Sequence, residues 1–275
     1  MNEKVVENYS KLQYWLLLIP LMILVSLVLF LYTHDALNIN GYIAVQKDWF
    51  YKINATLSQF PQIIYNLTQI GDALIFLSLL SILLIYAPAV WEALLSASLI
   101  SLLISSTLKN IFAVPRPAAF LDNNTFTIIG QKLQGHSSLP SGHSITVFTT
   151  LTVLLFAFLP KKMPQRIVWI LLMLCFGFLI ALTRVGVGAH FPFDVLTGST
   201  LGFMSALGGI FLSRKYKIWR WIGNKKFYPI FILLLLICGI GIANKIAAEF
   251  LPVYLIGLLV LIFSLYKITH VYLKK

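Results

Sequence analysis

Charged residues are scarce in this chain of 275 residues. They make up 11% of the sequence, whereas hydrophobic residues make up 59% and the mean hydropathy is +0.87. Soluble domains of similar size carry about 25% charged residues. The composition therefore excludes an ordinary soluble fold and indicates that most of the chain lies in lipid.

Acidic residues and cysteines are scarce as well. Nine Asp and Glu residues stand against 21 Lys and Arg residues, which gives a formal net charge of +12. Such a charge can indicate nucleic-acid binding, but here the cations are spread through short loops with no contiguous basic domain. We therefore expect no nucleic-acid partner and interpret the charges as a topology signal, with Arg214 to Lys226 also suited to anionic lipid head groups. Cys175 and Cys238 both fall in apolar runs and are not expected to be ligands.

Eight apolar runs approach the length of about 20 residues that a helix needs to cross a bilayer. The first is interpreted as a retained anchor, because Met1 to Leu12 carries acids and no small-residue cleavage site follows. The runs predict an all-α, polytopic membrane helical bundle. They extend approximately over Tyr14–Tyr32, Ala73–Trp91, Ala93–Lys109, Ser144–Leu159, Ile167–Thr183, Val195–Ser213, Phe227–Asn244 and Pro252–Val271.

Lys and Arg collect on one predicted side of the membrane, beside both termini and at 161–166 and 214–226. Because short cytoplasmic loops carry the excess of positive charge, we expect cytoplasmic termini. The two longest stretches outside the runs, His34 to Asp72 and Asn110 to His143, then lie on the opposite side. The aromatic residues at 49–51 in the first stretch predict a helix at the membrane interface.

Lys109 closes the third run, and Arg116 with Pro117 follows shortly after it. Two cations at a membrane surface are costly to desolvate unless an anion pairs with them, and a phosphate group offers several acceptor oxygens. In the alternative interpretation, both side chains simply extend to water. Lys109 and Arg116 are thus candidate phosphate-binding residues.

Pro140, Ser141, Gly142 and His143 lie where a loop enters the fourth run. A helix N-terminus offers unpaired N–H groups, glycine allows close approach of an anion, and the serine hydroxyl can add a hydrogen bond. His143 can hold a proton near neutral pH, as a general acid must. A plain helix cap with an interfacial histidine is the alternative.

Arg184, His190 and Asp194 form a third cluster, with Pro192 suited to the first turn of the sixth span. A histidine and a carboxylate four residues apart lie about one helical turn from each other. Asp194 can then accept a hydrogen bond from one ring nitrogen and leave a lone pair on the other, which activates a nucleophile. Alternatively, Asp194 is a helix cap and His190 an interfacial histidine.

These three clusters closely resemble the three motifs of the type 2 phosphatidic acid phosphatase family, which is related to the vanadium haloperoxidases. The resemblance covers approximately residues 93–212. It implies a catalytic bundle of six core membrane spans within residues 1–213, with the motifs at 109–194. Residues 214–226 then form a basic cytoplasmic loop, and residues 227–275 form an additional C-terminal helix pair without an assigned role.

The resemblance also implies a role for each site residue. His190 is the nucleophile that forms a phosphohistidine, Asp194 orients it, and His143 protonates the leaving oxygen and then activates water. The family's third motif usually begins with serine, where this chain has Thr183, which retains the hydroxyl. No metal or cofactor is expected, because cations replace the metal and no ligand-spaced cluster remains. The phosphoryl oxygens are bound by Lys109, Arg116, Ser141, Gly142 and Arg184.

The expected partner is a lipid phosphate in the membrane, with no obligatory protein partner. Among the substrates of the family we favour undecaprenyl diphosphate, ahead of lipid A phosphate, phosphatidylglycerol phosphate and phosphatidic acid. A lipid phosphotransferase would use the same intermediate, whereas the membrane setting argues against a haloperoxidase. A transporter with the cations as pathway charges is the non-enzymatic alternative. We expect an integral protein of a bacterial inner membrane with its site on the periplasmic or extracellular face.

Overall fold

The structure, a computed structural model, describes residues 1–274, and in this range the chain forms helices and no strand. This confirms the all-α class. The α-helices are α1 (Asn2–Ser10), α2 (Leu18–Thr33), α3 (Ile39–Ala44), α4 (Lys47–Leu57), α5 (Pro61–Ile70), α6 (Ala73–Leu80), α7 (Leu83–Tyr86), α8 (Pro88–Phe112), α9 (Pro117–Phe120), α10 (Gly142–Ala157), α11 (Met163–Gly186), α12 (Pro192–Tyr216), α13 (Tyr228–Ala248) and α14 (Pro252–Leu273), with short 3₁₀ turns η1 (Tyr14–Leu17), η2 (Arg220–Gly223) and η3 (Lys225–Phe227).

Six segments of the described chain are long and apolar enough to cross a membrane: η1 with α2, α8 with α9, α11, α12, η3 with α13, and α14. The pair α5 and α6, which is bent by 68°, passes the same test as a unit and has the form of a broken span or a re-entrant loop. The remaining expected run corresponds to α10, which has only 16 residues. The chain is therefore an integral membrane protein with a polytopic helical bundle.

The boundary expected between the second and third runs is wrong. The expected runs Ala73–Trp91 and Ala93–Lys109 meet at Glu92, but α8 begins at Pro88 and contains both Trp91 and Glu92. Proline lacks an N–H and suits the first helical position, where no intrahelical partner is needed, so the break falls directly before it. The polar start of α6 is also defined by the sequence, because the Asp72 side chain accepts a hydrogen bond from the Leu74 N–H at 2.8 Å.

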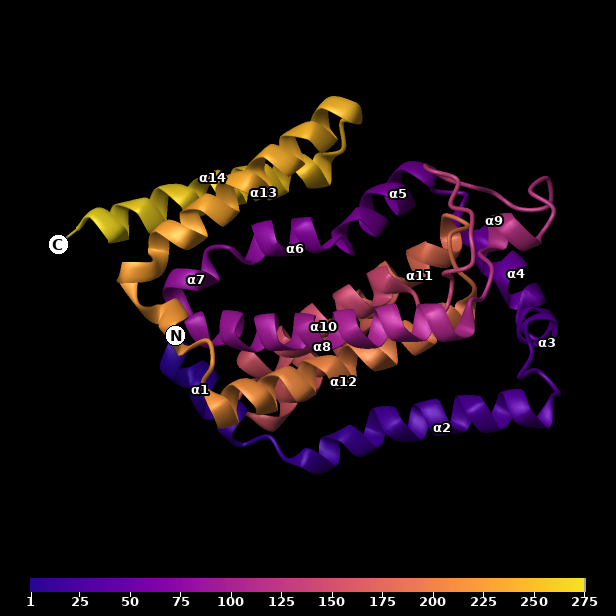
Figure 1. Cartoon of the computed structure of the whole chain (residues 1–275), viewed down its shortest axis with the longest axis horizontal. Helices are drawn as coiled ribbons and strands as arrows, with labels where there is room; N and C mark the ends of the chain where they lie inside the picture. The colour runs from indigo at the N-terminus through magenta and orange to yellow at the C-terminus, as the bar shows by residue number, and fades with distance from the viewer. Residues whose placement is uncertain (275) are drawn as a thin grey trace.

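The centre of the bundle is α12, packed against α8 and α10 (Figure 1). In its most apolar window 72% of the residues are buried, compared with 11% for the outer helix α2. Glycines permit this close packing: a Cβ on Gly198 would lie 2.6 Å from the Ser141 carbonyl oxygen, and one on Gly202 would lie 2.5 Å from that of Ile145. Small residues are the usual device by which membrane helices approach each other closely. The apolar side chains of α2 and α11 instead face outward, as expected for contact with lipid.

The two ends of the bundle differ in character. Both termini lie at one end, together with α1, whereas α3, α4, α9 and the long loop before α10 lie at the other (Figure 1). At the terminal end, the Arg214 guanidinium donates to the Tyr9 and Leu12 carbonyl oxygens, each at 2.9 Å. The expected placement of both termini on one side of the bundle is therefore seen, and the three motifs lie at the opposite end.

The segment at residues 34–72 forms helices, but its aromatic residues do not all lie at the surface. Trp49 is 69% exposed, whereas Phe50 is fully buried and its ring centroid lies 5.3 Å from that of Phe191. The expectation of an interfacial helix is therefore wrong for Phe50. This residue anchors α4 to the start of α12, next to the site.

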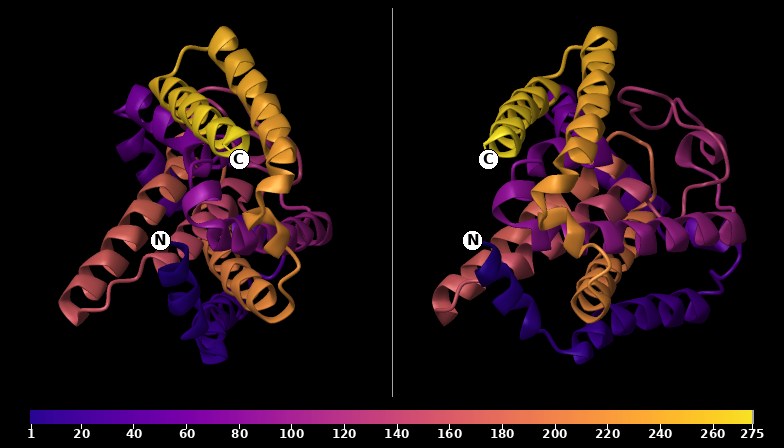
Figure 2. Two further views of the ribbon diagram at one scale, coloured as in Figure 1. Left: turned by 90° about the vertical axis from the view of Figure 1, so that its left-hand side faces the viewer. Right: turned by 60° about the vertical axis from the view of Figure 1, so that its left-hand side comes forward.

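The C-terminal pair α13 and α14 lies along α6 and α7, on one side of the bundle (Figures 1 and 2). Its apolar side chains share a core with the start of α8, where Trp91 packs with Phe231 and Leu261. Lys245 of α13 forms an ion pair with Asp72 at 2.7 Å. The pair is thus attached to the rest of the chain at both of its ends.

Candidate active site

The three motifs meet at one end of the bundle because each lies at a helix terminus. Lys109 is in the last turn of α8, and Arg184 is in the last turn of α11. Ser141 precedes the first residue of α10, and Asp194 is in the first turn of α12. Helices that alternate in direction bring these C-termini and N-termini to the same end.

His190 lies in the loop between α11 and α12 and is only 2% exposed. Its Nε2 atom is 3.3 Å from Nη1 of Arg116, while its Nδ1 atom is 3.5 Å from Oδ2 of Asp194. Burial and the neighbouring Arg116 guanidinium hold the pKa of His190 well below its ordinary value. The ring is therefore neutral at physiological pH and has a lone pair for one nitrogen.

Asp194 is fully buried and is held by three donors. Its carboxylate accepts hydrogen bonds from the Ser138 hydroxyl at 2.6 Å, the Tyr42 hydroxyl at 2.7 Å and the Phe191 N–H at 2.8 Å. The last of these joins the Asp194 side chain, in the first turn of α12, to the backbone N–H of the residue that precedes the helix. Asp194 is thus both a helix cap and a neighbour of His190, although the sequence analysis presented these as alternatives.

The assumed helical turn between His190 and Asp194 is wrong. α12 begins at Pro192, so His190 precedes the helix and is positioned by the loop. Both the Ala189 and the His190 N–H groups donate to the Arg184 carbonyl oxygen, at 3.0 and 3.2 Å. The backbone of the loop therefore connects the third motif's arginine with its histidine.

Lys109 meets the N-terminus of α10. A Cβ on Gly142 would lie 3.4 Å from Nζ of Lys109, so the absence of a side chain leaves room for the ammonium group and an anion. Ser141 is fully buried, and its hydroxyl accepts hydrogen bonds from the Ser144 hydroxyl and N–H at 2.9 and 3.4 Å. Ser141 therefore acts as a helix cap in this structure, and its contact with a phosphoryl group stays a prediction.

Arg184 and His143 line one polar cavity of about 440 Å³. Arg184 is 6% exposed; its Nη1 donates to the Thr68 hydroxyl at 2.9 Å, and its Nε has no partner within residues 1–274. A buried guanidinium with a free N–H is suited to an anionic ligand. Gly71, at the bend between α5 and α6, lies against His143, where a Cβ would be 3.1 Å from the ring.

The structure thus brings together Arg116, His190 and Asp194 by direct contacts, Lys109 and Gly142 by proximity, and His143 and Arg184 in the cavity.

Sequence reasoning missed Ser138, Tyr42 and Thr68. Ser138 lies only two residues before Pro140, so its position offered a signal. Tyr42 and Thr68 are far from the motifs in sequence, and only the fold shows their contacts. Within residues 1–274, no three His, Cys, Asp or Glu side chains lie close enough together to hold a metal ion.

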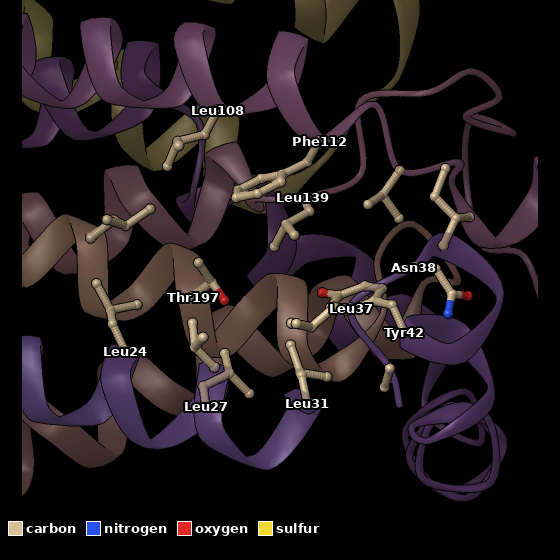
Figure 3. A pocket seen from close by; sticks show the side chains of 15 residues that line it. Leu24, Leu27, Leu31, Leu37, Asn38, Tyr42, Leu108, Phe112, Leu139 and Thr197 are labelled. Atoms are coloured by element: carbon tan, nitrogen blue, oxygen red, sulfur yellow. The ribbon is translucent and has the colours of Figure 1, made fainter. Parts of the chain in front are cut away.

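An apolar groove, separate from the polar cavity, adjoins the site through Tyr42 (Figure 3). Its volume is about 340 Å³, and α2, α8 and α12 form its walls. Tyr42, whose hydroxyl donates to Asp194, is one of its lining residues, and so is Leu139, which directly follows Ser138. Leu27, Leu31 and Phe112 supply much of the apolar surface visible in Figure 3.

The fold and the site together define a class of protein: a polytopic membrane bundle with a histidine, a carboxylate and several cations gathered at one end for an oxyanion. Residues 89–220 match the model of the PAP2 superfamily. The matched segment contains all three motifs, which confirms the resemblance drawn from them.

Two relatives support the same conclusion. Lipid A 1-phosphatase of Rhizobium johnstonii is 36% identical over 118 residues, which are 41% of this chain and 43% of that protein. The chain thus matches less than half the length of this relative. The crystal structure of Aquifex aeolicus LpxE has a TM-score of 0.50 and 27% sequence identity, and the match covers 62% of this chain and 96% of that one.

Proposed function

We propose that the chain is a membrane lipid phosphatase that works through a phosphohistidine on His190. One observation carries this proposal: the two ring nitrogens of the buried His190 face different groups. Nε2 faces the Arg116 guanidinium at 3.3 Å, where a phosphoryl oxygen would bind, and Nδ1 faces the Asp194 carboxylate at 3.5 Å. This is the arrangement of an activated nucleophile with an orienting carboxylate.

The proposed reaction has two steps. The Nε2 lone pair forms a bond to phosphorus, the bond from phosphorus to the lipid oxygen breaks, and His143 gives its proton to that oxygen. His143 then takes a proton from water, which forms a new bond to phosphorus and releases inorganic phosphate from His190. Lys109, Arg116 and Arg184 stabilise the charge on the equatorial phosphoryl oxygens, with the N–H of Gly142 as a further donor.

The apolar groove supports a lipid substrate. Its walls are aliphatic side chains of membrane-spanning helices, and its inner end reaches the Tyr42 hydroxyl that binds Asp194. A lipid whose acyl or prenyl tail lies in this groove could place its phosphate beside His190 while the tail stays among apolar side chains. We propose that residues 1–213 form the catalytic bundle, and that the site faces away from the cytoplasm in a bacterial inner membrane.

For the substrate, the name of the Rhizobium relative favours a lipid A 1-phosphate. We therefore place it ahead of undecaprenyl diphosphate, which the sequence analysis favoured and which stays a prediction. Phosphatidylglycerol phosphate and phosphatidic acid follow. A phosphotransferase would pass the phosphoryl group to a second lipid, so release of inorganic phosphate separates the two activities.

A panel of these lipids in mixed micelles tests the proposal with purified protein. We expect release of inorganic phosphate that persists in excess chelator, because the cations supply the charge that a metal would otherwise provide. Vanadate, which adopts the five-coordinate geometry of the transition state, should inhibit. Activity lost in chelator and restored only by a divalent ion would contradict the assigned roles of Lys109, Arg116 and Arg184.

A further inference from the structure

The polar cavity that holds His143 and Arg184 has a wall that none of the three motifs provides. The wall comes from the bend between α5 and α6 and from the tip of the α13–α14 pair, which we call the C-terminal hairpin (residues 228–273). The hairpin lies beyond residue 220, where the match to the superfamily model ends. Its polar residues in the cavity are Lys245, Glu249 and Tyr254.

Two short contacts hold the hairpin tip against α5 and α6. Nζ of Lys245 lies 2.7 Å from Oδ2 of Asp72, and the Tyr65 hydroxyl donates to Oε2 of Glu249 at 2.7 Å. Tyr254 lies beneath the ammonium group, with Nζ of Lys245 5.5 Å from its ring centroid. The tip is therefore ordered by specific polar contacts at the cavity, in addition to the apolar packing of Tyr254 with Ile75 and Ile242 below it.

The chemistry of this wall differs from that of the phosphoryl-binding wall. Asp72 and Glu249 outnumber Lys245 on this wall, whereas the third motif contributes the cation Arg184, which donates to the Thr68 hydroxyl of α5 at 2.9 Å. Gln69 and Gln131 add amide groups that both donate and accept hydrogen bonds. The two carboxylates disfavour a second phosphate beside them, and a lipid tail would remove the paired charges and the amide groups from water at a cost. Hydroxyl and amide groups of a ligand would replace that water with hydrogen bonds.

We propose that the C-terminal hairpin completes a head-group subsite for a hydroxyl-rich, sugar-type head group next to the phosphate. This inference rests on the proposed phosphatase function and assigns the residues outside the three motifs that would select for the head group. Phosphatidic acid and a prenyl diphosphate carry no hydroxyl or amide groups next to the phosphate. They would leave this wall in contact with water and gain no binding free energy from it. Sites built to hydrogen-bond a hydroxyl discriminate strongly against substrates that lack it, so the subsite determines specificity.

The test compares two substrates in the purified full chain: an acylated glucosamine 1-phosphate and a phosphatidic acid with the same acyl chains. We expect kcat/KM to favour the sugar lipid. Glu249→Ala and Lys245→Gln should lower the ratio of the two kcat/KM values by about tenfold or more, as loss of a charged hydrogen bond does. Lys267→Gln, on α14 roughly 20 Å from the tip along the helix, is the matched control and should leave the ratio unchanged.

Binding of the same two lipids to His190→Ala protein, measured by native mass spectrometry, tests the subsite without turnover. Weaker binding of the sugar lipid alone after Glu249→Ala in this background supports the proposal. Equal losses for both lipids, or no loss for either, would overturn it. Absence of turnover in the unmodified chain, with selective binding retained, would instead refute the phosphatase function and leave the subsite standing.

Discussion

The two histidines of the site differ in their surroundings and should fail in different ways. His190→Ala removes the atom that bonds to phosphorus, so turnover should fall to background. His143→Ala removes proton transfer, which typically costs a factor of about 10²–10⁴, but leaves the nucleophile in place. Its phosphohistidine should then accumulate with a substrate whose leaving group needs no proton.

Rapid quench with labelled substrate and peptide mapping locates this intermediate. The label should be acid-labile and base-stable and should map to His190. His136, in the loop between the first and second motifs and exposed, provides a control, since His136→Ala should retain turnover. Label on His143 would make that residue the nucleophile instead of His190. Full activity of His190→Ala would show that His190 is not the nucleophile.

Ser138 is the residue whose contribution was least expected from the motifs. Its hydroxyl donates to Oδ2 of Asp194 at 2.6 Å and lies 3.5 Å from Nδ1 of His190. Ser138→Ala should lower kcat by roughly ten- to a hundredfold, because a hydrogen bond to a buried charge is worth about 1.5–3 kcal/mol. Ser137→Ala, one residue earlier, should stay within about twofold. Steady-state kinetics on both variants measure the difference. Equal effects on kcat would show that Ser138 does not help to position Asp194 and His190.

At the scale of residues, the sequence predicted the side chains that carry distinctive chemistry. Lys109, Arg116 and Arg184 are unusual in an apolar chain, and His190 follows Arg184 closely along the sequence. Tyr42 could not be predicted, because its contact with Asp194 joins residues separated by more than half of the chain. A tyrosine among many apolar and aromatic residues gives no signal of such a contact.

At the scale of elements, the packing of α12 depends on individual glycines. A Cβ on Gly202 would lie 2.5 Å from the Ile145 carbonyl oxygen and 3.0 Å from the Thr149 N atom, and backbone atoms cannot easily move away. On Gly208 it would meet only the end of the Ile100 side chain, at 3.2 Å. Alanine substitutions at these two positions therefore distinguish the cost of a clash between helices from the gain in helix propensity.

Gly202→Ala should destabilise the protein by about 1–3 kcal/mol, as overpacking does. Gly208→Ala should be neutral or stabilising, because alanine favours a helix more than glycine does. Thermal unfolding in detergent, followed by the loss of helical circular dichroism, measures both. Equal midpoints for the two variants would show that α10 and α12 can separate without cost.

Helix boundaries were predictable where the sequence marks them and not elsewhere. Pro192 begins α12 as expected, and Ser141 caps α10. The break at Ala87 was missed because hydropathy stays high on both sides of Pro88, and the proline was not used to place it. The bend between α5 and α6 was missed as well, since Gly71 and Asp72 resemble the edge of a polar loop; the fold instead uses them to bring α5 beside His143.

At the scale of the whole molecule, the charge pattern predicted that both termini share one end. The structure places α1 and the basic segment after α12 there, and it places the motifs at the other end (Figure 1). The position of the C-terminal hairpin could not be predicted. Its sequence predicts two apolar helices and nothing about where they pack. Its tip is held by contacts of Lys245 and Glu249 with Asp72 and Tyr65, which lie far away in the sequence.

The direction in which the bundle crosses the membrane follows from the same charges. Short loops rich in Lys and Arg stay in the cytoplasm, so the loop at Lys162 should be cytoplasmic and the loop at Asp122, beside the site, should face outward. Single cysteines at these two exposed positions, in a background with Cys175 and Cys238 replaced, report the direction. An impermeant maleimide should label position 122 in intact cells and position 162 only after permeabilisation. Labelling of intact cells at position 162 alone would invert the bundle and place His190 on the cytoplasmic side.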